Sequence, residues 1–156
     1  MSSPPELVPH QPASTLAIGA DHGGLALKTT LLARLRAAGT AVLDLGTDAA
    51  SSVDYPDFAH AVCRAVTEGR AARGILVCGT GIGMSIAANR HAQIRCVLAH
   101  DVTTARLGRE HNDGNVLALG GRILGEELAW DIVSTFLSTR FEDGRHARRL
   151  AKLMPA

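Results

Sequence analysis

Aromatic residues are scarce in this chain, making up 3% of its 156 residues. Proteins that bind single-stranded nucleic acid stack bases on aromatic rings, so this scarcity argues against such a function. The formal net charge of +1 provides no overall attraction for a polyanion or an anionic membrane surface. No apolar run approaches the roughly 18 residues that indicate a membrane span. We therefore expect a small partner molecule, and neither nucleic acid nor membrane.

Cysteines are also few, and their number is odd. The spacings of Cys63, Cys78 and Cys96 fit neither a disulfide framework nor a zinc site, which indicates a reducing, cytoplasmic environment. Residues 1–14 contain four prolines where a signal peptide would have its hydrophobic region, so we expect a flexible extension there. The hydrophobic content of 46% supports one core, and we expect a single domain over residues 15–156.

The signatures of nucleotide cofactors are missing as well. The glycine-rich stretch 74–90 has neither the six-residue dinucleotide pattern with its following acid nor the lysine of a P-loop, which disfavours NAD and ATP. We expect no cofactor. The stretch is typical of a buried strand (75–77), a turn with three glycines (79–83) and a helix that begins near Met84.

Cys78 lies between that strand and the glycine-rich turn. A turn of this kind directs unpaired backbone N–H groups and the positive end of the helix dipole toward one point, where an anion or a developing oxyanion would be stabilised. The same field would favour the thiolate of Cys78. The structural alternative is an inert buried residue, because cysteine is among the most buried residue types.

Strand-length apolar segments alternate with segments of helical periodicity along the chain. The expected strands are residues 16–20, 41–45, 75–77, 94–99 and 115–119. The expected helices are residues 25–35, 58–66, a segment from 84, a segment from 101 to near 111, and residues 124–137. Parallel neighbours require a crossover connection, and the intervening helices supply it. We therefore predict an α/β fold, a Rossmann-like three-layer αβα sandwich with a five-stranded parallel sheet.

Ligands of such sheets bind at the carboxyl ends of the strands. The residues that the sequence places just past those ends are Asp21, His22, Tyr55, Cys78 to Thr80, and His100. Asp21 and His22 could form an acid–base or hydroxyl-binding pair, while the structural alternative for Asp21 is a helix cap. We therefore expect several chemically active side chains to converge on one edge of the sheet.

Further polar candidates follow in the second half of the chain. His111 and Asn112 lie at the expected end of a helix, where a cap or a surface histidine is the ordinary explanation. Arg145 and Arg149 lie one helical turn apart, which suits a phosphate clamp, and the alternative is a solvated basic face. Arg122 is open to both interpretations. A thiol on an anion-stabilising turn, titratable groups on one edge and an arginine pair together suggest proton transfer on a phosphorylated metabolite without a metal.

Five motifs occur in an order that resembles a known family. They are GADHGG from Gly19, DYPDFA from Asp54, GILVCGTGIGMSIAANR from Gly74, REHNDGNVLALGGR from Arg109 and GRHARR from Gly144. The sequence resembles the type B ribose-5-phosphate isomerases, in the family that they share with the subunits of galactose-6-phosphate isomerase. The resemblance covers roughly residues 15 to 153. It implies a phosphorylated sugar as substrate and a place in the pentose phosphate pathway.

The resemblance also implies a mechanism in which Cys78 is the general base. Cys78 would remove the proton from C2 of the open-chain aldose phosphate, and reprotonation of a cis-enediolate at C1 would give the ketose phosphate. Thr80 and the glycine-rich turn would form an anion hole for the enediolate oxygen. His111 would assist ring opening, with Asp21 nearby. Another branch of the family uses a glutamate where Met84 stands in this chain, so the sequence resembles the thiol branch.

Substrate binding is implied for the other matched residues. These are His22, Tyr55, Gly79, Gly81, Gly83, Asn112, Arg122, Arg145 and Arg149. Arg145 and Arg149 would bind the phosphate, helped by His22 and Arg122. The motifs do not fix the sugar, so the alternatives are an isomerase of erythrulose phosphate, allose 6-phosphate or galactose 6-phosphate. A non-catalytic module that binds sugar phosphates is a further alternative.

The position of His111 predicts a site that two subunits share. Cys78 follows the strand at 75–77, whereas His111 and Asn112 precede the strand at 115–119 and so belong to the opposite edge of the sheet. One subunit cannot easily bring them together. The resemblance implies a homodimer, or a tetramer, in which the His111 segment and the Arg122 region of one subunit complete the site of its neighbour.

Overall fold

The computed structural model describes residues 15–155, so the extension expected over residues 1–14 lies outside the described residues. Its centre is a five-stranded sheet in the order β2-β1-β3-β5-β4, and every pair of neighbours is parallel. The strands are β1 (Leu16–Ala20), β2 (Val42–Asp44), β3 (Arg73–Cys78), β4 (Cys96–Leu98) and β5 (Val116–Gly120). The predicted five-stranded parallel sheet is confirmed.

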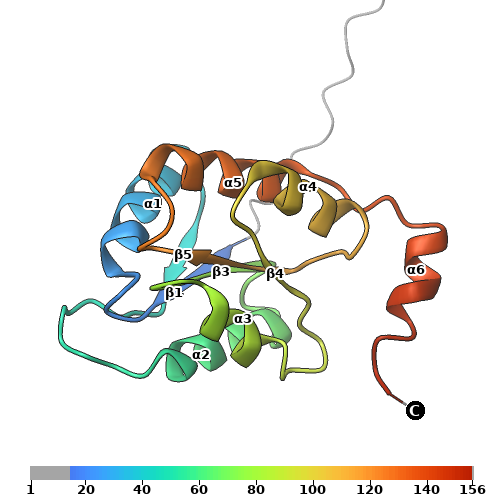
Figure 1. Cartoon of the computed structure of the whole chain (residues 1–156), viewed down its shortest axis with the longest axis horizontal. Helices are drawn as coiled ribbons and strands as arrows, with labels where there is room; N and C mark the ends of the chain where they lie inside the picture. The colour runs from blue at the N-terminus through green and yellow to red at the C-terminus, as the bar shows by residue number, and fades with distance from the viewer. Residues whose placement is uncertain (1–14, 156) are drawn as a thin grey trace, which may run out of the picture.

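Helices cover both faces of this sheet (Figure 1). One face carries α1 (Leu25–Ala37), α4 (Val102–Glu110) and α5 (Glu126–Ser138), and the other carries α2 (Tyr55–Thr67) and α3 (Ile82–Ala88). The short helix α6 (Arg145–Leu150) stands apart from these layers, beyond the β4 edge of the sheet (Figure 1). The three-layer αβα sandwich is therefore confirmed. None of the helices within residues 15–155 is long and apolar enough to cross a membrane.

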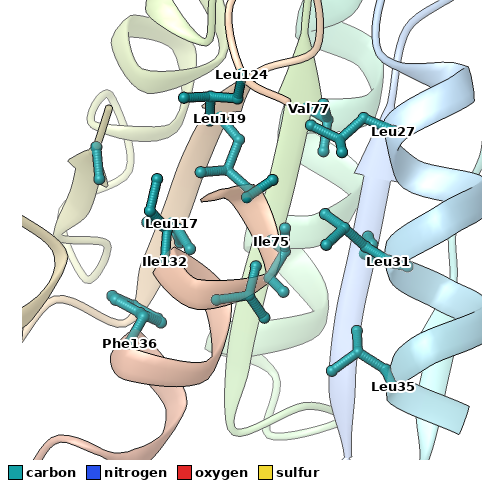
Figure 2. Packing of buried hydrophobic residues seen from close by; sticks show 14 of the residues in the cluster. Leu27, Leu31, Leu35, Ile75, Val77, Leu117, Leu119, Leu124, Ile132 and Phe136 are labelled. Atoms are coloured by element: carbon teal, nitrogen blue, oxygen red, sulfur yellow. The ribbon is translucent and has the colours of Figure 1, made fainter. Parts of the chain in front are cut away.

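The central strand β3 is buried on both faces, as its lack of polar alternation predicts. Successive side chains of a strand point to opposite faces, so Ile75 and Val77 pack under α1 and α5, whereas Leu76 and Cys78 face α2 and α3. Figure 2 shows the cluster of buried side chains to which Ile75 and Val77 belong. Side chains of α1 and α5 lie on either side of the strand residues. Full burial of each such aliphatic side chain stabilises the fold by roughly 1.5–3 kcal/mol. This packing also fixes the face of the sheet on which the Cys78 thiol lies.

The fourth strand is shorter than predicted. The sequence favours a strand over residues 94–99, but β4 covers only Cys96–Leu98. The chain before it forms a turn, because the Ile94 N–H donates to the His91 carbonyl at 3.0 Å. The backbone N–H of Arg95 then donates to a side-chain oxygen of Asn115 at 2.8 Å instead of joining the sheet ladder. Cys96, which we expect to be buried, is only partly buried.

Two helical segments also differ from the prediction. The helix α3 begins at Ile82, two residues before Met84, because Gly81 adopts a φ of 79° and turns the chain early. The basic tail is the GRHARR segment that begins at Gly144. The sequence gives its arginines a helical spacing but predicts no separate helix there, whereas in the structure the segment forms α6. Gly144 precedes α6 with a φ of 61° and redirects the chain into it. The arginine pair of the tail therefore does lie on a helix.

Loops at the carboxyl edge of the sheet contact one another through their backbones. A Cβ atom on Gly24 would lie 2.2 Å from the carbonyl oxygen of Val77, and one on Gly23 would lie 3.2 Å from the nitrogen of Gly79. A Cβ atom on Gly121 would lie 2.9 Å from the oxygen of Gly23. The loops after β1, β3 and β5 thus meet where only glycine fits. The neighbours β1 and β3 lead to helices on opposite faces, which is the topological switch point where such sheets bind ligands.

Gly24 provides a test of this packing. In Gly24→Ala the new methyl group would overlap the Val77 carbonyl, so we expect the free energy of unfolding to fall by roughly 1–3 kcal/mol, the usual cost of overpacking. Urea denaturation followed by circular dichroism measures it. Gly125→Ala is the matched control, because Gly125 also precedes a helix but has no atom within 4 Å of its Cβ position. Equal losses in the two variants would contradict the close approach of the loops.

Candidate active site

The thiol of Cys78 lies at the carboxyl end of β3, with 4% of the residue exposed. The backbone N–H of Gly81 donates a hydrogen bond to its sulfur at 3.1 Å, so the glycine-rich turn folds back over the thiol. Only glycine fits at position 81, because φ is positive there and a Cβ atom would lie 2.9 Å from the Leu119 backbone. The hydroxyl of Thr80 accepts from the Ile82 N–H at 3.2 Å and secures the first turn of α3. The sequence therefore correctly predicts a thiol held against backbone amides.

Asp21 follows β1 and lies beside this turn. One carboxylate oxygen accepts the N–H of Gly24 at 3.1 Å, and the side chain is 7% exposed. This bond secures the chain just before α1, but the N-cap of α1 is Gly24, so Asp21 is not the helix cap that the structural alternative predicts. The loop also brings the carboxylate close to the β3 turn, because a Cβ atom on Gly23 would contact both Asp21 and Gly79. Asp21 therefore helps to form the edge that carries Cys78.

His22 is oriented by the loop before α2. Its Nδ1 accepts the backbone N–H of Val53 at 3.2 Å, which places the proton of the neutral ring on Nε2. Nε2 is then the nitrogen that can donate to an anion. Tyr55, at the start of α2, packs its ring over Gly83, where a Cβ atom would lie 2.7 Å from the ring. Both side chains reach the carboxyl edge, as the sequence predicts.

Arg122 lies on the same edge and in the same chain as Cys78. Its backbone N–H donates to the Gly79 carbonyl at 3.0 Å, and its guanidinium lies 3.3 Å from the position that a Cβ atom on Gly79 would take. The expectation that the Arg122 region completes a neighbouring subunit's site is therefore wrong. The loop after β5 packs directly on the loop after β3, and this contact holds Arg122 at its own subunit's edge. His100 is exposed after β4, and Asp101 caps α4 by accepting the Thr104 N–H at 2.7 Å.

A second set of predicted residues lies elsewhere. His111 ends α4, and four residues later the Asn115 carbonyl accepts the Gly74 N–H at the amino end of β3. The tail is joined to this end of α4, because the Glu142 N–H donates to the Glu110 carbonyl at 3.0 Å. The residues of this second set are His111, Asn112, Arg145 and Arg149. The predicted separation of His111 from the edge that carries Cys78 agrees with the topology.

His111 stacks on His146, which lies in the GRHARR segment from Gly144 and is not among the site residues predicted from the sequence. The rings of His111 and His146 lie 4.4 Å apart at an interplanar angle of 14°. His146 is 5% exposed, and its Nε2 lies 3.4 Å from a carboxylate oxygen of Glu142, which is 4.0 Å from Nε2 of His111. Burial, followed by the positive charge of Arg145, lowers the pKa of His146. The lowered pKa of His146 favours its neutral ring, which suits the close stacking of the two rings.

These three side chains also form a group that could hold a metal ion. Among the described residues, His111, Glu142 and His146 offer ligand atoms that all lie within 4.8 Å of one another. The lone pair of an imidazole lies in its ring plane, and near-parallel planes do not direct two lone pairs at one point. The arrangement therefore favours a stacked pair with a shared carboxylate over a chelate. The spacing of Glu142 and His146, four residues apart, is the sequence signal that could have identified this group.

The other two cysteines differ from Cys78 in their surroundings. Cys63 is fully buried in the core between α2 and the sheet, and burial raises its pKa to about 11. Burial also raises the pKa of Cys96. Both residues are therefore protonated thiols at neutral pH. Cys63 is therefore a core residue.

Comparison with known proteins gives the family of the chain. The Ribose/Galactose Isomerase family matches residues 16–153 of the chain. The chain belongs to this family. It is 47% identical to ribose-5-phosphate isomerase B of Escherichia coli over 135 residues, which cover 86% of this chain and 91% of the relative. The sugar-phosphate isomerase family predicted from the sequence is thus confirmed, and with it an aldose–ketose isomerase instead of a non-catalytic binding module.

Two further relatives bear on the fold and the substrate. The solved structure of Clostridium thermocellum ribose-5-phosphate isomerase B is 49% identical, with a TM-score of 0.88 and coverage of 89% of this chain and 94% of that one. D-erythrulose-4-phosphate isomerase of Pectobacterium atrosepticum is 40% identical over 140 residues, covering 89% of this chain and 92% of the relative. The family therefore contains proteins that are named for different sugar phosphates.

The contact between His22 and Val53 generates a prediction that needs no substrate. In His22→Ala the Val53 amide loses its acceptor, and we expect its hydrogen exchange to be roughly 2- to 10-fold faster, in line with one lost hydrogen bond. Exchange followed by NMR measures this rate. His22→Asn is the control, because an asparagine oxygen can take the place of Nδ1 and keep the amide protected. Unprotected exchange of this amide in the native protein would show that His22 does not hold the loop.

Proposed function

We propose that this protein interconverts ribose 5-phosphate and ribulose 5-phosphate, with Cys78 as the general base and without a metal or cofactor. The observation that carries the proposal is the Cys78 sulfur, held 3.1 Å from the Gly81 N–H at the switch point of the sheet. Asp21, His22 and Arg122 surround it on the same edge. The names of the Escherichia coli and Clostridium thermocellum relatives support this choice of sugar.

The arrangement suits a proton transfer between adjacent carbons. As a thiolate, Cys78 takes the proton from C2, the C2–H electron pair forms the enediolate double bond, and the carbonyl oxygen at C1 becomes negative. The backbone amides of Gly79 to Gly83, with Thr80, stabilise this oxygen. Return of the proton from Cys78 to C1, with transfer of the hydroxyl proton from O2 to O1, produces the ketose and restores the thiolate. No atom is gained or lost, so the reaction needs no oxidant.

Phosphate binding and ring opening require the second set of residues. Arg145 and Arg149 lie one turn apart on α6 and are exposed, which leaves both guanidinium groups available to phosphate oxygens. His22, through its Nε2 hydrogen, and Arg122 add donors from the edge that carries Cys78. His111 would give and accept the proton that opens the sugar ring, while Glu142 and the stacked His146 hold its ring in place.

The two sets lie at opposite ends of the sheet, so we propose a homodimer as the smallest active unit, whether or not dimers pair into tetramers. In it, His111, Asn112 and α6 of one subunit complete the edge that carries Cys78 in the other. A groove of about 570 Å³ between α4 and the chain after α6 supports a paired surface here. Leu153 and Met154 line this groove and are 59% and 60% exposed. A two-fold interface would contain two such shared sites.

The preferred sugar is the open alternative within this proposal. The relative named for erythrulose phosphate is 40% identical to this chain, against 47% for the Escherichia coli ribose-5-phosphate isomerase, so similarity does not separate the two sugars. A panel of four-, five- and six-carbon sugar phosphates separates these substrates by their kcat/KM values. The highest value for ribose 5-phosphate is the expected result.

Replacement of Cys78 tests the identity of the base. We expect Cys78→Ala to fold normally and to lose about 10²–10⁴ in kcat, the usual contribution of a positioned base, while KM changes little. The measurement is ketose formation from ribose 5-phosphate. Cys63→Ala is the control, because Cys63 lies in the core between α2 and the sheet, does not line the proposed paired surface and should keep its turnover. Near wild-type turnover in Cys78→Ala would remove the thiol mechanism.

Complementation tests the shared site. Cys78→Ala and His111→Ala are each expected to be inactive, but a heterodimer would combine one intact Cys78 with one intact His111. After subunit exchange at equal concentrations, we expect recovery of about a quarter of wild-type activity, because half of the dimers are mixed and each has one intact site. Differently tagged subunits report the exchange itself. Exchange without recovery would mean that His111 serves its own subunit or is not catalytic.

A further inference from the structure

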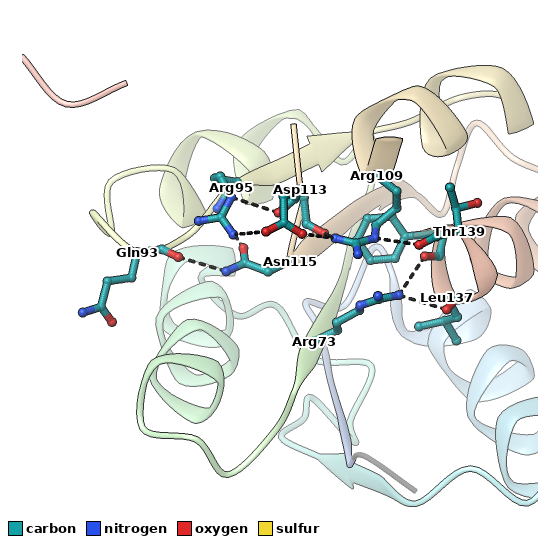
Figure 3. Close-up of polar contacts among 10 residues, drawn as sticks. Arg73, Gln93, Arg95, Arg109, Asp113, Asn115, Leu137 and Thr139 are labelled. Carbon is teal, nitrogen blue, oxygen red and sulfur yellow. Dashed lines mark hydrogen bonds and ion pairs between the residues drawn. The ribbon is translucent and has the colours of Figure 1, made fainter. Parts of the chain in front are cut away.

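A polar pocket of about 420 Å³ lies at the amino end of the sheet, opposite the edge that carries Cys78. The charged residues that line it are Arg73 at the start of β3, Arg95 before β4, Arg109 in the last turn of α4, and Asp113. Figure 3 shows these side chains together, with Asn115 and Gln93 beside them. The strand β3 runs from Arg73 to Cys78, so at about 3.3 Å per residue the two ends lie roughly 16 Å apart. The pocket is therefore separate from the candidate active site.

Positive charge in this pocket exceeds negative charge. Three guanidinium groups and one carboxylate among the lining residues leave two positive charges. Asp113 is shared, since it binds Arg109 at 2.9 Å and Arg95 at 3.3 Å. Arg73 has no carboxylate partner within residues 15–155, and burial, followed by the charge of Arg109, lowers its pKa. An excess of half-buried cations is costly unless an anion neutralises it.

The arginines are also fixed in orientation. Arg73 donates through Nη1 to the carbonyls of Phe136 and Leu137, at 3.0 and 2.9 Å, at the end of α5. Arg109 is 5% exposed and donates to the carbonyls of Thr139 and Gly114 as well as to Asp113. Both guanidinium groups lie 5.8 Å from the centre of the Phe136 ring. Little conformational entropy would be lost when these groups bind a ligand.

These contacts leave one end of each guanidinium unused. Among the described residues, no partner is present for Nη2 of Arg73, Nη2 of Arg109 or Nη1 of Arg95 (Figure 3). None of these atoms is buried without a partner, so all three are open to solvent. Unused guanidinium donors around one pocket match the oxygens of a tetrahedral oxyanion.

We propose that this pocket is a second, non-catalytic anion site that takes inorganic phosphate or the phosphate group of a small ester. The bonds to the ends of α4 and α5 make the binding groups part of the framework of the protein. The proposal does not depend on the proposed isomerase reaction. Failure of one therefore leaves the other untouched.

Titration calorimetry with inorganic phosphate, at constant chloride, tests this site. The starting protein is the double variant Arg145→Ala/Arg149→Ala, which removes the proposed clamp on α6. Phosphate should still bind this protein. In the same background, Arg73→Gln and Arg95→Gln should each weaken binding by about tenfold or more, because each removes a charge-assisted contact. Arg70→Gln is the matched control, since Arg70 is exposed, pairs with Glu68 and does not line the pocket.

Asp113→Asn provides a test in the opposite direction. It removes the single negative charge of the pocket, so phosphate should bind more tightly. Asn tolerates the backbone of this position, where φ is 44°, so the fold should be retained even where an arginine variant is unstable. A titration with glycerol phosphate distinguishes the two sources of the anion. Binding of both compounds supports a site for the phosphate group of an ester. Binding of the free ion alone supports a site for inorganic phosphate. Unchanged affinity in Asp113→Asn and Arg95→Gln, or no binding at all, would overturn the proposal.

Discussion

The edge of the sheet that carries Cys78 depends on direct backbone contacts between the loops after β1, β3 and β5. Gly23 approaches Gly79, and Gly121 approaches Gly23, at distances that exclude a Cβ atom. Because no side chain separates these loops, Asp21, Cys78 and the Arg122 backbone come together without any long connecting segment. The thiol is consequently positioned by the sheet and its loops, not by contacts of its own side chain alone. The glycines of the GADHGG, CGTG and LGGR segments are one packing unit.

The second constraint is the direction of the helix that follows β4. Since α4 returns across the sheet, it places His111 at the amino end, and the tail that begins near Glu142 stays with it. The histidine stack and its carboxylate thus form a unit on α4 and α6 that is physically separate from the thiol. In the proposed mechanism each unit supplies only part of the groups for isomerisation, and the proposed homodimer would combine them.

The sequence predicts the parts of the molecule that depend on local patterns. Continuous apolar runs identify β1, β3 and β5, and the glycine-rich turn identifies the loop that holds Cys78. It does not predict contacts between distant segments. The late start of β4 depends on the side chain of Asn115, and the stack of His111 on His146 joins two helices. Arg122 is placed on its own subunit by a backbone bond to Gly79, which no motif spacing reveals.

Net charge conceals the electrostatic organisation of this chain. A formal charge of +1 argues against a general affinity for polyanions, because acidic and basic residues nearly balance over the whole sequence. The folded chain nevertheless gathers arginines around the amino-end pocket, from positions 73, 95 and 109, where one carboxylate serves two of them. Spacings of 14 and more residues hide such a cluster from any search for basic runs. In the proposed anion site, selectivity for a small anion would arise from local excess charge in fixed guanidinium groups, which is compatible with an almost neutral protein.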